Sequence, residues 1–382
     1  MPHVFHREAL KRDPSDIRTN IALGKTALKN GDYVKARNYF TTAIKRITKD
    51  YTRPLDCEVL YLQGITLKAL GLYDEAVDTL YRATWDYAWH SAAYLELARI
   101  SCEQGNFEKA LLQIEESLST NTKNNSAINL KASVLRKLND FEAAASTLTP
   151  LKSDPLDFRA CNENYLIANE QGDRVSAENI LVSLNKKMRG FDQNYLNLSI
   201  DYLNDGLLSE SEDVLLRFRG SNQLVDYYLG FISDRKGDKE QAEILFSNGS
   251  IQKVDYCFPY RLEEIKILNK ALEYNEMDAN ALYYLGNLLY DKQPAKAIEY
   301  WEKAVLSDPG FAIAYRNLGW GYYRNDKNGD QSVSFVIRRE VSFIAARFDP
   351  FRKDLWNLVH PPLLVPTCNS LLQNSRTAKG CN

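Results

Sequence analysis

The sequence lacks the features that mark membrane-spanning, metal-binding and disulfide-stabilised proteins. It contains no run of 18 or more apolar residues, and its first 50 residues contain no signal-peptide apolar region. Histidine is rare, with 4 residues in 382, and the 6 cysteines form no CxxC pair, which argues against a zinc site or a disulfide framework. We therefore expect a cytoplasmic protein in a reducing compartment, with no cofactor, no metal and no membrane partner.

Neither sign of charge is in excess. The chain has 48 Lys and Arg against 50 Asp and Glu, for a net charge of -2. A surface that binds nucleic acid needs an excess of Lys and Arg to replace the phosphate counterions. The balance, and the absence of a continuous Lys/Arg stripe, argue against an RNA-binding helical repeat, so we expect no nucleic-acid partner.

The motifs of common enzyme classes are also missing. There is no GxxxxGK[ST] loop, no GxSxG elbow and no HExxH motif. A carboxylate pair such as Glu263-Glu264 is expected to lie on a solvated helix face. Cys57, Cys102 and Cys161 lie within helical patterns and are expected to fill packing space. We propose no catalytic residue and expect that the protein is not an enzyme.

Helix-breaking residues are few, but they are periodic. Gly, and less often Asn, adopts the left-handed conformation that ends a helix at little cost. Such residues recur about every 34 positions, at Gly31, Gly71, Gly105, Asn139, Gly172, Gly206 and Gly237. Between them the apolar residues follow helical spacing, and no stretch alternates with period two for long enough to make a strand. The sequence therefore predicts an all-α chain of helix pairs.

Small residues form a second periodic pattern. Two antiparallel helices approach closely only where the side chains at their crossing are small. Offsets of twelve and then seven residues connect the small residues of each unit, as in Gly24, Ala36, Ala43 and again in Gly64, Ala76, Ala83. Large residues such as Phe40 and Leu80 are expected to fill the space around each crossing.

Together these patterns resemble the tetratricopeptide repeat (TPR), a helix pair of 34 residues. The best copy runs over 282–290 and 297–304 and closes with Asp308-Pro309. The resemblance covers roughly residues 1–359 and implies a right-handed α-solenoid of helix hairpins whose first helices line a concave surface. In a narrower likeness, Ala83-Thr84-Trp85, Phe258-Pro259-Tyr260 and 284–290 are similar to the TPR arm of a bacterial multidomain family. That family has an uncharacterised β-rich N-terminal region.

The repeats divide the chain into six segments. Because the first segment has no partner helix and Pro361-Pro362 interrupts the last pair, we expect a part of a larger protein or a shortened relative of one. The segments are 1–16, a remnant of a preceding second helix and its turn; 17–157, clear repeats; 158–256, degenerate repeats; 257–278, an extra helix; 279–359, clear repeats with the last one incomplete; and 360–382, a disordered tail.

The resemblance also implies which residues face the concave surface. The predicted binding set lies in the last two clear repeats and comprises Tyr283, Tyr284, Asn287, Tyr290, Arg316, Asn317, Trp320 and Tyr323. Amides and a guanidinium among aromatic rings can hydrogen-bond a peptide backbone or carboxylate while the rings cover its apolar parts. The alternative is that these rings pack between neighbouring helices or beneath another domain. In the earlier repeats the same projection gives, among others, Lys25, Lys68, Glu96, Arg99, Asn129, Ser133 and Arg136.

A clamp for chaperone tails is not expected, because Tyr283 and Ile313 stand where that TPR class has lysines. The leading hypothesis is a non-catalytic protein–protein interaction scaffold that binds a peptide or protein segment, of unknown identity, on the concave surface of the first helices. The alternative is an accessory TPR arm of a larger, possibly carbohydrate-active enzyme whose catalytic domain is absent from this chain.

Overall fold

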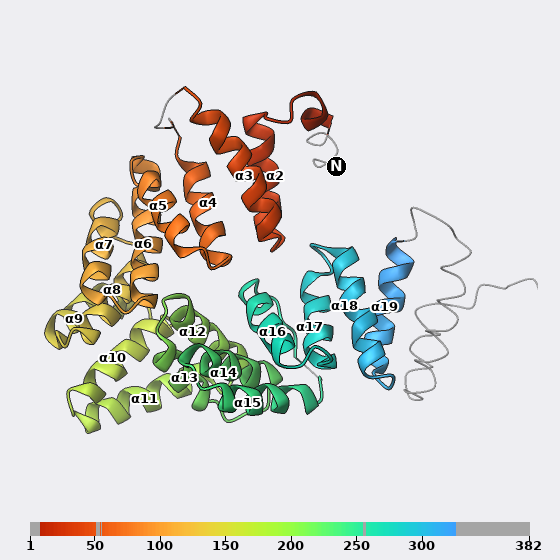
Figure 1. Ribbon diagram of the computed structural model, residues 1–382. Coiled ribbons are helices and arrows are strands. Elements are labelled where there is room, and N and C mark those ends of the chain that lie inside the picture. Colours follow the sequence, from red (N-terminus) through yellow and green to blue (C-terminus); the bar gives the residue numbers. More distant parts are fainter. Residues whose placement is uncertain (1–7, 51–53, 55, 255–256, 326–382) are drawn as a thin grey trace, which may run out of the picture. The chain divides into compact units, whose positions relative to one another are not determined.

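A computed structural model describes residues 8–50, 54, 56–254 and 257–325, which fold almost entirely into helices (Figure 1). No β-strand occurs among these residues, so the predicted all-α fold is confirmed, and nothing in them resembles a β-rich region. Residues 8–12 are helical as well. The further helices are α2 (Ile17–Lys29), α3 (Tyr33–Ile47), α4 (Glu58–Ala69), α5 (Tyr73–Ala83), α6 (Tyr87–Glu103), α7 (Phe107–Thr120), α8 (Asn125–Lys137), α9 (Phe141–Thr147), the short 3-10 helix η1 (Thr149–Ser153), α10 (Phe158–Glu170), α11 (Arg174–Met188), α12 (Asp192–Asn204), α13 (Leu208–Leu216), α14 (Gln223–Lys236), α15 (Lys239–Ile251), α16 (Glu263–Tyr274), α17 (Ala279–Leu289), α18 (Pro294–Ser307) and α19 (Ala312–Asn325).

Consecutive helices pack as hairpins, from α2 with α3 to α14 with α15. Each hairpin also packs on the next, and the core is therefore a row of local clusters. In one such cluster, Leu60 of α4, Leu80 of α5 and Leu97 of α6 are all buried together. This sharing of core residues between neighbours is how a solenoid buries apolar surface that a single hairpin would expose. The predicted α-solenoid of TPR-like hairpins is therefore confirmed.

In five of the seven predicted hairpin turns, a residue with positive φ is followed by a residue whose side chain caps the next helix. The predicted turn residues all have positive φ angles: Gly31, Gly71, Gly105, Asn139, Gly172, Gly206 and Gly237. At the first of them, Gly31 has φ 73°, and the next residue, Asp32, caps α3 by accepting a hydrogen bond from Lys35 N at 3.2 Å. One residue thus ends the first helix and its neighbour starts the second.

The predicted crossings are confirmed by the space around the helical glycines. A Cβ atom on Gly24 of α2 would lie 2.4 Å from Cε1 of Phe40 in α3, and one on Gly64 of α4 would lie 2.5 Å from Cγ of Leu80 in α5. Both distances are shorter than van der Waals contact, so only glycine fits unless the partner side chain moves. The large residue sixteen positions later fills the space that the missing side chain leaves.

The chain forms two compact units, Met1–Ala297 and Ile298–Asn382, whose boundary falls within α18. In the second unit, Gly321 of α19 lies against Ile298 and Trp301 of α18, where an added Cβ would be 3.0 Å and 3.2 Å from their side-chain atoms. The parts of the predicted segments 279–359 and 360–382 that follow residue 325 lie outside the described residues, as does 1–7. The division into segments stays a prediction.

Candidate ligand-binding pocket

Ion pairs connect the first helices of successive hairpins. Lys25 of α2 contacts Glu58 of α4 at 2.6 Å, and Lys68 of α4 contacts Glu96 of α6 at 2.8 Å. Glu96 also lies 2.5 Å from Arg99 on its own helix. Burial alone would raise the pKa of Glu96, but the charges of Lys68 and Arg99 outweigh it and lower this pKa to about 2. Lys25, Lys68 and Glu96, which were predicted to face the concave surface, therefore form ion pairs between neighbouring repeats.

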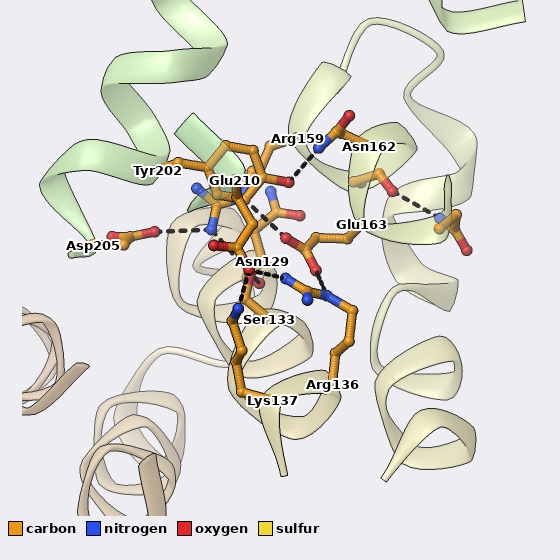
Figure 2. A network of polar contacts seen from close by, with 12 residues as sticks. Asn129, Ser133, Arg136, Lys137, Arg159, Asn162, Glu163, Tyr202, Asp205 and Glu210 are labelled. Carbon is orange, nitrogen blue, oxygen red and sulfur yellow. Dashed lines mark hydrogen bonds and ion pairs between the residues drawn. The ribbon is translucent and has the colours of Figure 1, made fainter. Parts of the chain in front are cut away.

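A buried polar network continues this series between α8, α10 and α13 (Figure 2). Arg136 of α8 is 1% exposed, and its guanidinium reaches Glu163 Oε2 at 2.9 Å, Glu170 Oε1 at 2.5 Å and Glu210 Oε1 at 2.9 Å. Lys137 contacts Glu210 as well. A buried guanidinium is tolerated only when carboxylates compensate the loss of water, and here three of them do so.

A second arginine lies next to this network. Arg159 of α10 donates to Ser133 Oγ at 2.9 Å and contacts Asp205 Oδ2 at 3.1 Å. Its Cζ atom lies 3.5 Å from the centre of the Tyr202 ring, a short cation–π contact. Arg99 Nε donates to the other oxygen of Asp205 at 3.0 Å. Asp205, at the end of α12, therefore holds arginines from α6 and α10.

Arg99, Arg159 and Asp205 form one wall of a pocket with a volume of about 430 Å³. The pocket is polar and lies on the first helices α6, α8, α10 and α12 and on the approach to α10. Its lining residues are Arg99, Asn125, Ser126, Asn129, Leu156, Asp157, Phe158, Arg159, Asn194, Asn197, Leu198, Asp201, Asn204 and Asp205. Five of them are asparagines, whose amides can donate to and accept from a peptide backbone at once.

Some hydrogen-bond acceptors in the lining have no partner among the described residues. The Oδ1 atom of Asn129 is buried without a hydrogen bond, although its Nδ2 atom donates to both oxygens of Asp157, at 3.3 Å and 3.1 Å. Asn129 as a whole is only 6% exposed. Asp201 makes no hydrogen bond or ion pair with any other described residue and is exposed to solvent in the pocket. Burying an acceptor without a donor costs free energy, so a ligand that donates to Asn129 Oδ1 would be favoured here.

Burial and the neighbouring charged residues both affect the pKa of Asp201. Partial burial raises it above its usual value, and the nearby Asp205 raises it further. The positive charges of Arg159, Arg261 and Arg99 act in the opposite direction but do not cancel the rise. The rise in the pKa of Asp201 therefore comes from burial, because the three arginines together outweigh the one neighbouring aspartate.

Part of the inner surface is covered by the chain itself. The approach to α16 contacts α12, where Tyr260 OH donates to Asn197 Oδ1 at 2.8 Å and Arg261 also donates to that atom. On α14, Tyr228 OH donates to Glu264 of α16 at 3.1 Å. Segments of the chain therefore lie against part of the surface that the first helices form, and binding on that surface stays a prediction. α16 packs on α14.

The structure corrects two members of the predicted binding set. Tyr284 is fully buried and Tyr283 is 3% exposed, so both rings belong to the core. Tyr284 meets Tyr227 of α14 edge-on, with ring centroids 6.3 Å apart. These two rings therefore pack between neighbouring helices, as the alternative interpretation of the sequence predicted. The reason is that α17 packs on α15 and α16, which leaves no open face at these positions.

The other members are divided between the two units. Asn287 and Tyr290 belong to the first unit, whereas Arg316, Asn317, Trp320 and Tyr323 belong to α19 in the second. Trp320 is 43% exposed and lies against Tyr323, with ring centroids 5.6 Å apart. Arg316 donates to the neighbouring Asn317 Oδ1 at 3.1 Å. A binding role for these six residues stays a prediction.

Sequence reasoning missed the α12 side of the pocket. Its polar residues Asn194, Asn197, Asp201 and Asp205 are spaced by three or four positions, the spacing that aligns side chains on one helix face. This spacing is visible in the sequence, but it lies in a repeat whose small-residue pattern is degenerate. The projection that selected Asn129 and Arg99 from the clear repeats was therefore not extended to it.

The buried thiols offer no nucleophile. Burial raises the pKa of Cys102 to about 12 and that of Cys257 to about 11, so both thiols stay protonated and act as packing groups. In the described part of the chain, no cluster of three or more His, Cys, Asp or Glu side chains could hold a metal ion. No described helix is long and apolar enough to cross a membrane.

Comparison with known proteins agrees with the repeat pattern. A family model described as a tetratricopeptide repeat matches residues 21–89, which cover α2 to α5 and the start of α6. The helix pairs of this chain are TPR-like. The match covers two hairpins, and the turn and crossing geometry described above extends the same pattern along the first unit.

Several solved structures match this chain at low identity and with TM-scores below 0.5. A tetratricopeptide repeat protein from Parabacteroides merdae is 17% identical over 68% of this chain and 98% of that protein, with a TM-score of 0.45. The TPR domain of P58(IPK) is 14% identical over 95% of this chain and 99% of that one, with a TM-score of 0.28. The human IFIT1 dimer with m7Gppp-AAAA is 15% identical over 78% and 66%, with a TM-score of 0.34. At these identities each likeness concerns the fold alone.

Proposed function

We propose that this protein is an interaction scaffold that binds an extended segment of a partner protein in the polar pocket of its first helices. The observation that carries the proposal is the set of asparagine side chains in the pocket together with the unpartnered Oδ1 atom of Asn129. An extended peptide presents N–H and C=O groups at regular spacing, and side-chain amides from several helices can pair with both.

The scaffold role also fits the architecture. Hairpin repeats bring side chains from several first helices to one surface, so a ligand is contacted by several repeats at once. The pocket collects Arg99 from α6, Asn129 from α8, Arg159 from α10 and Asp201 from α12. The rigid ion-pair network behind Arg159 holds this wall in place before a ligand arrives, which lowers the entropy cost of binding.

The finer expectations from the sequence remain part of this proposal. A cytoplasmic location, a non-catalytic role and a partner other than nucleic acid stay predictions. The alternative of an accessory arm of a larger, possibly carbohydrate-active enzyme has no contact or cavity among the described residues in its favour.

A peptide selection tests the proposed function. A display library of random heptapeptides is selected on the full chain and on two variants that each add a tryptophan at the second residue of a helix. Ser126→Trp fills the pocket from α8, and Ser209→Trp is the matched control on α13, because both serines are exposed and only Ser126 lines the pocket. We expect peptides to be enriched on the wild type and on Ser209→Trp but not on Ser126→Trp. Equal enrichment on all three proteins, or none on the wild type, contradicts the proposal.

A further inference from the structure

The charges of the two arginines in the pocket wall are already matched by carboxylates of the chain. Arg99 lies between Glu96 and Asp205, and its pKa is raised above the usual value because these charges outweigh the effect of burial. Arg159 contacts Asp205 at 3.1 Å, and its Nε atom faces Glu163 Oε1 at 3.7 Å. Arg159 Nε makes no hydrogen bond, but carboxylates of the chain lie against both guanidinium groups.

The acceptors in the pocket are in the opposite situation. The lining contains three aspartates and two arginines, and a third arginine, Arg261, also lies near Asp201. Asp157 is occupied, because it accepts from Asn129 Nδ2 and from Ala160 N at the start of α10. Asp205 is occupied by both arginines. Asp201 is the lining aspartate that has no hydrogen bond or ion pair with another described residue.

Asn129 provides an independent observation that points to the same chemistry. It is more than nine-tenths buried and lines the pocket, and its Oδ1 atom accepts no hydrogen bond. Buried carbonyl oxygens of this kind are normally paired. A ligand group that pairs with both Asn129 Oδ1 and the Asp201 carboxylate must donate hydrogen bonds, and a positive charge on it would complement the carboxylate. Guanidinium and ammonium groups do both and accept none.

We propose that the pocket receives a cationic side chain, an arginine or a lysine, of the partner segment, with Asp201 as its counter-charge and Asn129 Oδ1 as a further acceptor. This inference rests on the proposed function, since it names the chemistry of the segment that the scaffold binds. Arg261 lies close enough to influence Asp201 but is held by Asn197 and by Tyr260 OH, so it lies at the edge of the pocket and not in the ligand's place.

The test uses peptides selected on the full chain. Each selected peptide is resynthesised with arginine replaced by citrulline, or lysine replaced by norleucine, which keep the shape and remove the charge. Binding is measured by calorimetry on the wild type, on Asp201→Asn and on Glu240→Gln, a control that removes an exposed carboxylate of α15 outside the pocket lining. We expect the neutral peptides to bind the wild type about tenfold more weakly, and the Asp201→Asn variant to lose this difference while Glu240→Gln keeps it.

Three results would overturn the inference. If pocket-dependent peptides contain no common arginine or lysine, or if citrulline and norleucine bind as well as the cations, the ligand is not cationic, and the proposed scaffold function still stands. If Asp201→Asn retains the full preference for the charged peptide, the counter-charge lies elsewhere. If no peptide depends on Ser126, the proposed function itself fails, and this inference fails with it. Arginine-rich and lysine-rich selections distinguish the two cationic side chains.

Discussion

Arg99 Nε donates a 3.0 Å hydrogen bond to Asp205 Oδ1, although the two residues are 106 positions apart in the chain. Arg99 lies on the first helix of the hairpin α6–α7, and Asp205 follows the first helix of the hairpin α12–α13. A second long-range contact, between Glu103 and Arg235 at 2.5 Å, connects α6 with α14. The curve of the first unit is therefore tight enough for its first helices to contact one another across the inner face, and this closeness creates the pocket.

The buried arginine of the network gives the first prediction. Arg136→Met should destabilise the protein by about 3–5 kcal/mol, because it leaves Glu163 and Glu210 buried without their shared cation. The exposed pair of Arg37 and Glu75, 3.0 Å apart, provides the control, and Arg37→Met should cost less than about 1 kcal/mol. Urea unfolding followed by circular dichroism measures both. Similar losses for the two variants would mean that the network does not stabilise the fold.

The helix crossings give the second prediction. Gly64→Leu should destabilise by about 1–3 kcal/mol, because even its Cβ atom would overlap Leu80, which is fully buried in the facing helix. Ala69→Leu adds the same side chain at an exposed position of the same helix and should change stability by less than about 0.5 kcal/mol. Thermal unfolding compares the two variants. Equal melting temperatures would show that Gly64 is not at a close crossing.

The ion pair of Glu96 predicts how stability depends on pH. The pKa of Glu96 is lowered in the folded protein from 4.5 to about 2, so its ionised form stabilises the fold above the unfolded value. This contribution, on the order of 3 kcal/mol, should be lost as the pH falls from about 5 towards 2. Glu96→Gln should therefore flatten the pH dependence of the free energy of unfolding in that range. An unchanged pH dependence in Glu96→Gln would contradict the assignment.

The correction at Tyr284 gives the fourth prediction. Tyr284→Ala should destabilise by about 3–5 kcal/mol, because it removes a fully buried ring that packs against Tyr227. Trp320→Ala removes a ring that is 43% exposed and should cost less than half as much. The midpoints of urea unfolding measure both effects. If Tyr284→Ala is as mild as Trp320→Ala, the tyrosine is not a core residue and its predicted role in binding regains support.

Local features of the fold could be predicted because they depend on neighbouring residues. Gly31 and Asp32 determine one turn by backbone conformation and capping alone, and Gly64 and Leu80 are joined by the fixed geometry of one hairpin. Such signals repeat in the sequence and identify the hairpins wherever the pattern is intact.

The features that were missed depend on how distant repeats approach one another. Tyr284 is buried because α16 and α17 pack together where the repeat spacing is interrupted. The repeat pattern does not predict which helices α16 packs against. In the same way, Arg136 was expected on the concave face, but three carboxylates from two other helices bury it. Asp201 joins the pocket through the curvature of the whole unit, which no single helix determines.

Hydrogen–deuterium exchange of the full chain, with and without a selected arginine peptide, tests the central claim most directly. We predict that the peptide slows exchange in the first helices around the pocket, α8, α10 and α12, and leaves α17 and α19 unchanged. Protection confined to α17 and α19, where the aromatic set lies, or spread over the outer helices, would contradict the assignment of the pocket as the binding site.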